Sequence, residues 1–154
     1  MPAIDSRLKE LGLALPEGST PAANYIPWTR SGNLVFISGQ IPRQDGKPAF
    51  LGKLGQGRSA EEGYEAAKNC ALSLIAHLRD ACGGDLDRVV RVVKLTGFVN
   101  SAPDFTEQPK VVNGASDLFV AIFGDKGRHS RSAVGTASLP FGVAVEVEGI
   151  FEIT

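Results

Sequence analysis

The stretch His129–Gly149, HSRSAVGTASLPFGVAVEVEG, decides how this chain is expected to fold. Small and apolar residues alternate on both sides of a Leu-Pro pair, as in two half-buried strands joined by a turn. Three charged residues, Arg131, Glu146 and Glu148, interrupt this pattern. If the turn is centred on 139–142, the stretch predicts a β-hairpin that closes the chain.

The two faces of this predicted hairpin differ in their residues. Val145 and Val147 would share a core-facing side with Val134 of the partner strand. The opposite side would carry Arg131 and Glu146 among alanines and glycine, four residues apart, or about 13 Å at ~3.3 Å per residue. That spacing is too long for an ion pair. We therefore expect a ligand or a neighbouring subunit to lie against the small residues.

Two helices are predicted upstream of this hairpin. Ser59-Ala-Glu-Glu62 has the pattern of a capping box, and the apolar stripe that follows predicts a helix to about Cys82, ended by two glycines. A second stripe follows Pro109 and ends at Gly124, with capping residues in 104–107. Both helices are long enough to cover a sheet.

Strands are predicted on both sides of the first helix. A hairpin is predicted from NYIPWTR (24–30) and NLVFISG (33–39). The Gly/Pro-rich residues 40–57 are predicted to form a loop, and a further strand is predicted for RVVRVVKLTGFV (88–99). The order is β-β-α-β-α-β-β, which favours an α+β sandwich with helices on one face of one sheet. If the other sheet face is apolar, we expect it to be covered by oligomerisation.

Composition narrows the class of protein. With 154 residues, the chain is expected to form a single domain, 1–154, with an N-terminal helical extension over about 1–22. The net charge of −1 argues against a broad grip on nucleic acid, and no apolar run is long enough for a membrane span, so we expect a cytoplasmic protein. Cys70 and Cys82, twelve residues apart in one predicted helix, are too far apart for a disulfide.

Two motifs resemble one family. SGQIP (38–42) after a strand and RSAVGTASLPFGVAVEVEGI (131–150) are similar to the reactive intermediate deaminases, the RidA/YjgF-like proteins formerly called endoribonuclease L-PSP or translation inhibitors. The resemblance implies a chorismate-mutase-like fold, a single mixed sheet with two long helices on one face, assembled as a homotrimer with clefts between subunits. It also implies hydrolysis of 2-imino acids and enamines, such as 2-iminopropanoate and 2-aminoacrylate, to 2-oxo acids and ammonia, without a cofactor or metal.

The resemblance also implies roles for individual residues. Arg131 matches the arginine that binds the substrate carboxylate, and Glu146 matches the acidic residue that positions the attacking water. Ala133 stands where the family often has a cysteine. The predicted catalytic residues are therefore Arg131 and Glu146, and the predicted substrate-binding residues are Tyr25, Ser38, Gly39, Asn113, Arg131 and Ala133.

The residue types suit this chemistry. A guanidinium is a rigid donor fork that matches a carboxylate, and a glutamate can orient or deprotonate a water. A second hypothesis is a trimeric module that binds or senses small 2-oxo carboxylates without turnover. Ribonuclease activity is disfavoured by the charge and by the lack of a His/Lys acid–base pair. His77 is expected to be partly exposed on its helix, and His129 to lie at the surface.

Overall fold

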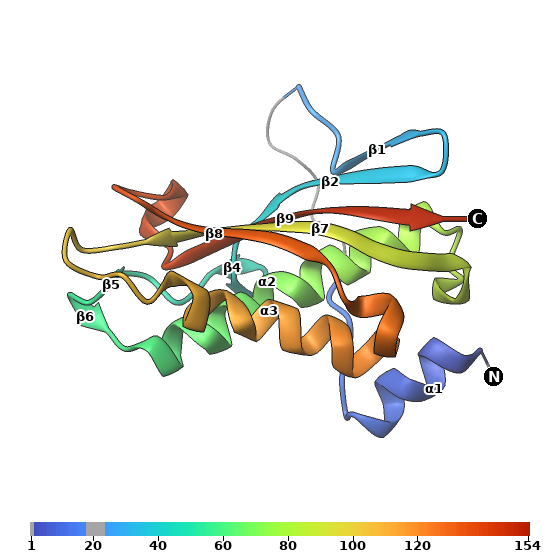
Figure 1. The fold of residues 1–154 in the computed structure, drawn as a ribbon, viewed down its shortest axis with the longest axis horizontal. Coiled ribbons are helices and arrows are strands. Elements are labelled where there is room, and N and C mark those ends of the chain that lie inside the picture. The colour runs from blue at the N-terminus through green and yellow to red at the C-terminus, as the bar shows by residue number, and fades with distance from the viewer. Residues whose placement is uncertain (1, 18–23) are drawn as a thin grey trace.

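The computed structural model describes residues 2–17 and 24–154, and its centre is a five-stranded mixed sheet. The strand order is β1-β2-β9-β7-β8, in which β7 and β8 are parallel and the other pairs antiparallel. Both long helices, α2 and α3, lie on one face of this sheet (Figure 1). The expected α+β sandwich with helices on one face is confirmed. The bounds are α1 Ala3–Glu10, β1 Trp28–Ser31, β2 Leu34–Gln40, α2 Ala60–Ala81, β7 Val89–Asn100, α3 Gln108–Phe123, β8 Ser130–Thr136 and β9 Val145–Ile153.

The first long helix, α2, begins and ends as its sequence predicts. The Ser59 hydroxyl accepts a hydrogen bond from the Glu62 amide, and the Glu62 carboxylate accepts one from the Ser59 amide, which completes the capping box. Gly83 then adopts a positive φ of 65° just beyond the C-cap residue Cys82. Both cysteines are buried and unbridged.

The second long helix, α3, has Pro109 in its first turn and Gly124 as its C-cap, both as predicted. Its N-cap residue is Glu107, whose side chain makes no capping hydrogen bond, so the expected side-chain cap is absent at this helix. The helix packs closely on β7, because a Cβ built at Gly97 would lie 2.5 Å from a Val112 methyl carbon. This close contact fixes α3 over the β7–β8 edge of the sheet.

The last two strands do not form the predicted hairpin. β8 pairs in parallel with β7, and β9 pairs with β7 on one side and β2 on the other, so β7 lies between them. The predicted loop 40–57 also contains short paired segments. These are β3 Arg43–Gln44 with β4 Lys47–Pro48, and β5 Lys53–Leu54 with β6 Gly57–Arg58. Three 3₁₀ turns complete the described elements: Leu86–Arg88, Gly124–Gly127 and Pro140–Gly142.

The strand inserted between β8 and β9 reverses part of the predicted face assignment. In β9, Val145 and Val147 are fully buried on the helix-covered face, as predicted. Arg131 of β8, however, is opposite the fully buried Leu95 of β7, whereas Glu146 is opposite Phe98. Because side chains alternate along β7, Arg131 lies on the helix-covered face and Glu146 on the other, open face. The prediction that they share a face is wrong.

The N-terminal segment packs on the main body of the chain. The amides of Ala3 and Ile4 each donate to the Asp87 carboxylate at 2.9 Å, and Arg7 Nε donates to the carbonyl of Ala121 at 2.8 Å. The predicted extension over 1–22 includes residue 1 and residues 18–22, which lie outside the described part of the chain. Among the helices that the structure describes, none has the length and apolarity that a membrane crossing requires.

Candidate functional site

Arg131 is held against α3 by neutral acceptors. Its Nη1 donates to Asn113 Oδ1 at 2.8 Å and to Ser116 Oγ at 3.1 Å, and its Nη2 lies 3.5 Å from the carbonyl oxygen of Pro109. Asn113 and Ser116 are three residues apart, which places both side chains on one face of the helix. Within residues 2–17 and 24–154, no carboxylate pairs with this guanidinium. Its positive charge therefore remains available to an anion.

Two other predicted residues lie close to Arg131 in the fold. Asn113 belongs to α3, and its side-chain oxygen accepts a hydrogen bond from Arg131. Ala133 lies two residues along β8, opposite Gly97, and packs partly buried against the core. The prediction that Ala133 belongs to a shallow open face is therefore wrong. The open side of β8 instead presents Val134, which is 45% exposed.

Glu146, Ser38 and Gly39 form a second group on neighbouring strands. A Cβ built at Gly39 would lie 2.5 Å from Glu146 Oε2, so only a glycine lets the carboxylate lie against β2 in this position. Ser38 precedes this glycine, and its amide donates to the carbonyl of Pro27 at 2.9 Å. The SGQIP motif thus provides the backbone that adjoins Glu146.

Tyr25 lies beside this second group at an exposed position. The Ser38 hydroxyl donates to the carbonyl of Ile26 at 3.2 Å, which connects the Tyr25 segment to the SGQIP strand. The Tyr25 side chain is 55% exposed. A tyrosine with this much exposed surface can contact a molecule that approaches from outside the chain.

Burial changes the acidity of Glu146. Desolvation raises the pKa of its carboxyl above the ordinary value, and the nearby negative charge of Glu148 raises the pKa further. A carboxyl with a raised pKa is a stronger base when it is ionised. This environment suits a group that accepts a proton from water.

The predicted site residues therefore form two groups that one chain does not bring together. Asn113, Arg131 and Ala133 lie at the β8–α3 edge, on the helix-covered side. Tyr25, Ser38, Gly39 and Glu146 lie around β2 and β9, with Glu146 on the open face. One strand, β7, separates β8 from β9 in the sheet.

Two residues of the Arg131 surroundings were not predicted. Ser116 accepts from Arg131, and its Oγ lies 2.9 Å from His129 Nε2. His129 is half-buried rather than at the surface, and its Nδ1 lies 2.6 Å from the carbonyl of Gly127. The sequence contains a signal for both, because His129 is two residues from Arg131 in an extended segment and Ser116 is three residues from Asn113 on a helix.

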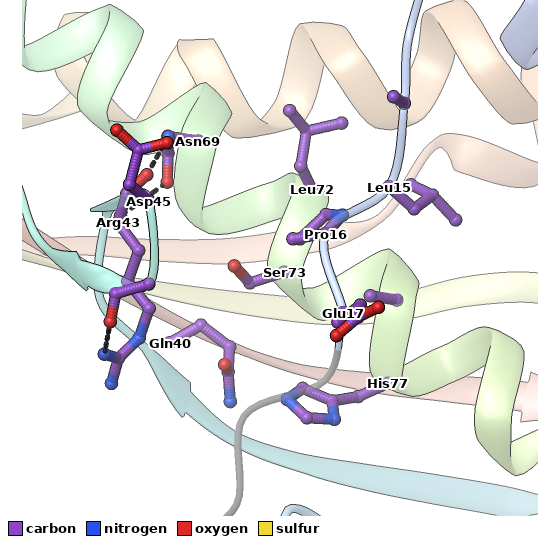
Figure 2. Close-up of a pocket in the computed structure, with 13 residues that line it drawn as sticks. Leu15, Pro16, Glu17, Gln40, Arg43, Asp45, Asn69, Leu72, Ser73 and His77 are labelled. Carbon is purple, nitrogen blue, oxygen red and sulfur yellow. Dashed lines mark hydrogen bonds between the residues drawn. The ribbon is translucent and has the colours of Figure 1, made fainter.

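A large cavity lies elsewhere, between α2, the end of β2 and the segment Ala14–Glu17 (Figure 2). Its volume is about 660 Å³. Gln40, Ser73 and His77 contribute buried polar side chains to its wall, and none of the predicted site residues lines it. His77 is 4% exposed, so the prediction of a partly exposed histidine is wrong.

Charge in this cavity is close to balanced. Arg43 and Glu17 lie on opposite sides of the view in Figure 2, with Asp45 near Arg43. Burial lowers the pKa of His77, although Asp80 partly opposes this, so the imidazole is neutral at neutral pH. The cavity lining thus holds one cation, Arg43, together with two carboxylates, Glu17 and Asp45, whereas no carboxylate of the described residues pairs with Arg131.

Comparison with known proteins places this arrangement in a family. The family model described as "YjgF/chorismate_mutase-like, putative endoribonuclease" matches residues 5–150. Protein TCP17 of Trypanosoma cruzi is 48% identical over 151 residues, covering 97% of this chain and 94% of that protein. This chain belongs to the YjgF/chorismate-mutase-like family, and the resemblance inferred from its two motifs is confirmed.

Solved structures agree over nearly the full length. The protein Atu1372 from Agrobacterium tumefaciens, whose function is described as unknown, is 47% identical with a TM-score of 0.93, covering 99% of this chain and 93% of that one. A structure from Shewanella oneidensis MR-1, described as a "putative endoribonuclease", is 37% identical with a TM-score of 0.94, covering 98% and 99%. The N-terminal helix therefore belongs to a fold that these two proteins share.

Proposed function

We propose that this protein hydrolyses reactive 2-imino acids and their enamine tautomers to 2-oxo acids and ammonia. The observation that carries the proposal is the state of Arg131. Its guanidinium is held in place by Asn113 and Ser116, yet both acceptors are neutral. A positioned cation without a carboxylate partner in the described chain is suited to a small carboxylate ligand.

The second part of the proposal is that two copies of the chain complete each site. Glu146 lies on the opposite side of the sheet from Arg131, so a substrate held by one cannot reach the other within a single chain. The open face carries exposed apolar side chains, among them Phe36 and Val134. Covering such a face with another copy is favourable, and a ring of three copies repeats one heterologous contact. We infer a homotrimer with a cleft at each subunit boundary.

The proposed reaction requires only positioning and one base. Arg131 holds the carboxylate of the 2-imino acid, which fixes the neighbouring C=N carbon relative to a water. Glu146 from the next subunit accepts a proton from that water, and the water oxygen bonds to the carbon. The C=N π electrons move to the nitrogen of the protonated imine. The protonated Glu146 returns its proton to the nitrogen of the resulting carbinolamine, and the C–N bond then breaks with its electron pair leaving on ammonia. The hydroxyl proton passes to the Glu146 carboxylate as the C=O bond of the 2-oxo acid forms.

The test is a coupled assay for imine hydrolysis. An amino-acid oxidase acting on alanine produces 2-iminopropanoate, and semicarbazide traps the imine that has not been hydrolysed. We expect the protein to reduce trapping and Arg131→Ala to lower kcat/KM by about a hundredfold or more, because a charge-assisted bidentate contact is lost. Arg91→Ala removes an exposed arginine of β7 and serves as the matched control. Equal rates for wild type and Arg131→Ala would refute the proposal.

A binding module without turnover is the second candidate. Asn113 and Ser116 position the Arg131 guanidinium within one chain, so Arg131 can bind a carboxylate without Glu146. Glu146, the proposed base, lies on the other face of the sheet. This alternative predicts saturable binding of 2-oxopropanoate that Arg131→Ala abolishes, with no effect of either protein on semicarbazide trapping. The same two variants therefore distinguish the candidates.

A further inference from the structure

A chain of hydrogen bonds connects Arg131 to the backbone through two side chains. Arg131 Nη1 donates to Ser116 Oγ at 3.1 Å, Ser116 Oγ lies 2.9 Å from His129 Nε2, and His129 Nδ1 lies 2.6 Å from the carbonyl oxygen of Gly127. This series of hydrogen bonds thus runs from Arg131 on β8 to Ser116 on α3, and then to His129 and Gly127, which precede β8. It links the proposed carboxylate-binding residue to a fixed backbone atom.

The protons in this chain can each be assigned. A carbonyl oxygen only accepts, so His129 Nδ1 must carry the hydrogen that bonds to Gly127. Burial lowers the pKa of His129, and the positive charge of Arg131 lowers it further, which together outweigh the opposing bond to Gly127. The neutral ring therefore has an unprotonated Nε2. The Ser116 hydroxyl must donate to that nitrogen, which leaves its lone pairs for Arg131.

The same bonds determine which edge of the guanidinium is free. The two hydrogens of Arg131 Nη1 are used by Asn113 Oδ1 and Ser116 Oγ. Nη2 makes one long contact of 3.5 Å to the Pro109 carbonyl, and Nε donates to no residue that the structure describes. The Nε–Nη2 edge thus keeps a pair of parallel donors. A carboxylate can accept both in a bidentate contact.

We propose that Ser116 and His129 are positioning residues, which turn Arg131 so that its Nε–Nη2 edge binds the carboxylate of the ligand. His129 acts through Ser116 by holding the hydroxyl in the orientation that accepts from Nη1. This inference rests on the proposed function, since it assigns the contact that the substrate would make. Ser116 and His129 are thereby added to the site. Neither residue would contact the substrate, and neither is among the predicted site residues.

The binding test compares four variants by titration calorimetry with 2-oxopropanoate. Ser116→Ala and His129→Leu should each raise Kd about tenfold, because each removes a hydrogen bond in a chain that ends on a charged group. His129→Gln retains an acceptor near Nε2 and should stay within about threefold. Ser31→Ala changes an exposed serine of β1, at the other edge of the sheet from β8, and should leave Kd unchanged.

A double-mutant cycle tests whether His129 acts through Ser116. If His129 acts only through its hydrogen bond to Ser116, removing Ser116 already removes its effect. The Ser116→Ala/His129→Leu double variant should therefore bind about as weakly as Ser116→Ala alone. The imine assay should show the loss mainly in KM, with kcat within about threefold of wild type. Independent, additive losses would overturn the positioning role of His129, and so would wild-type affinity in both single variants.

Nitrogen chemical shifts of the imidazole give a readout independent of turnover. The proposal expects His129 in the Nδ1–H form near neutral pH, with the Nε2 resonance changed by Ser116→Ala and little affected by Ser31→Ala. An Nε2–H form would overturn the proposal whatever the binding data show. If wild type neither binds 2-oxopropanoate nor hydrolyses the imine, the proposed function fails and the positioning role fails with it. Tight binding by wild type and by every variant overturns only the positioning role.

Discussion

The two faces of the central sheet are built from the same strands but have different partners. Phe151 of β9 is fully buried under the helices, whereas Phe36 of β2, on the other face, is 39% exposed. They lie on neighbouring strands at adjacent register positions, since Val35 is opposite Phe151 and Phe36 is opposite Ile150. The helix-covered face thus supplies the stability of one chain. The open face carries exposed apolar surface and Glu146, and we propose that another copy of the chain covers it.

The largest effect on stability should come from the covered face. Phe151→Ala removes a fully buried ring and should lower the free energy of unfolding by about 3–5 kcal/mol, because apolar contact is lost and a cavity remains. Phe141→Ala, at a position 73% exposed, should change it by less than about 0.5 kcal/mol. Urea unfolding measures both. Similar losses in the two variants would contradict the assignment of the core.

A charge on the open face should affect assembly more than folding. Phe36→Lys should weaken association by about a hundredfold or more, because an unpaired ammonium would be buried between copies. Sedimentation velocity should then show smaller species, with the far-ultraviolet circular dichroism of wild type. Imine hydrolysis should fall with assembly. Persistence of the wild-type oligomer would show that this face is not the contact surface.

A smaller effect is expected where β2 meets Glu146. Gly39→Ala places a methyl 2.5 Å from Glu146 Oε2 and should cost about 1–3 kcal/mol through overpacking and displacement of the carboxylate. In a Glu146→Ala background the same change should cost much less, since the obstructing group is gone. Thermal or urea unfolding of the four proteins measures this coupling. Equal costs in both backgrounds would mean that Gly39 is not required by Glu146.

The smallest effect is a pH dependence at Glu146. Because burial raises its pKa, the folded chain holds this proton more tightly than the unfolded chain does. Its contribution to stability therefore falls as pH rises from the ordinary carboxyl pKa through the raised pKa. Glu146→Gln should raise the unfolding midpoint by roughly 1–3 °C at pH 7, with little change near pH 4. A larger gain at pH 4 would contradict this sign.

Local signals in the sequence identified the helices correctly. The capping box at Ser59 and the proline after Glu107 act within a few residues, so they locate helix starts without knowledge of the rest of the fold. The apolar alternation of β9 likewise predicted which of its side chains are buried. The family was also identifiable, because its two motifs are continuous in sequence.

Strand pairing was not predictable in the same way. Alternation shows which residues share a face within one strand, but it does not show which strand is the neighbour. The turn at Leu139-Pro140 suggested that β8 and β9 pair, yet β7 lies between them. This one insertion moved Arg131 to the helix-covered face. It also changed the candidate site from one hairpin face to two groups on opposite sides of the sheet.

The sequence by itself determined the two long helices, the buried face of β9, the family and the identity of Arg131 and Glu146 as site candidates. Short-range hydrogen bonds and side-chain periodicity encode the first two of these features. Only the tertiary structure decided that Ser116 contacts both Arg131 and His129, and that Glu146 lies on the opposite face. Those relations join residues from different elements, and packing between elements is what brings them together.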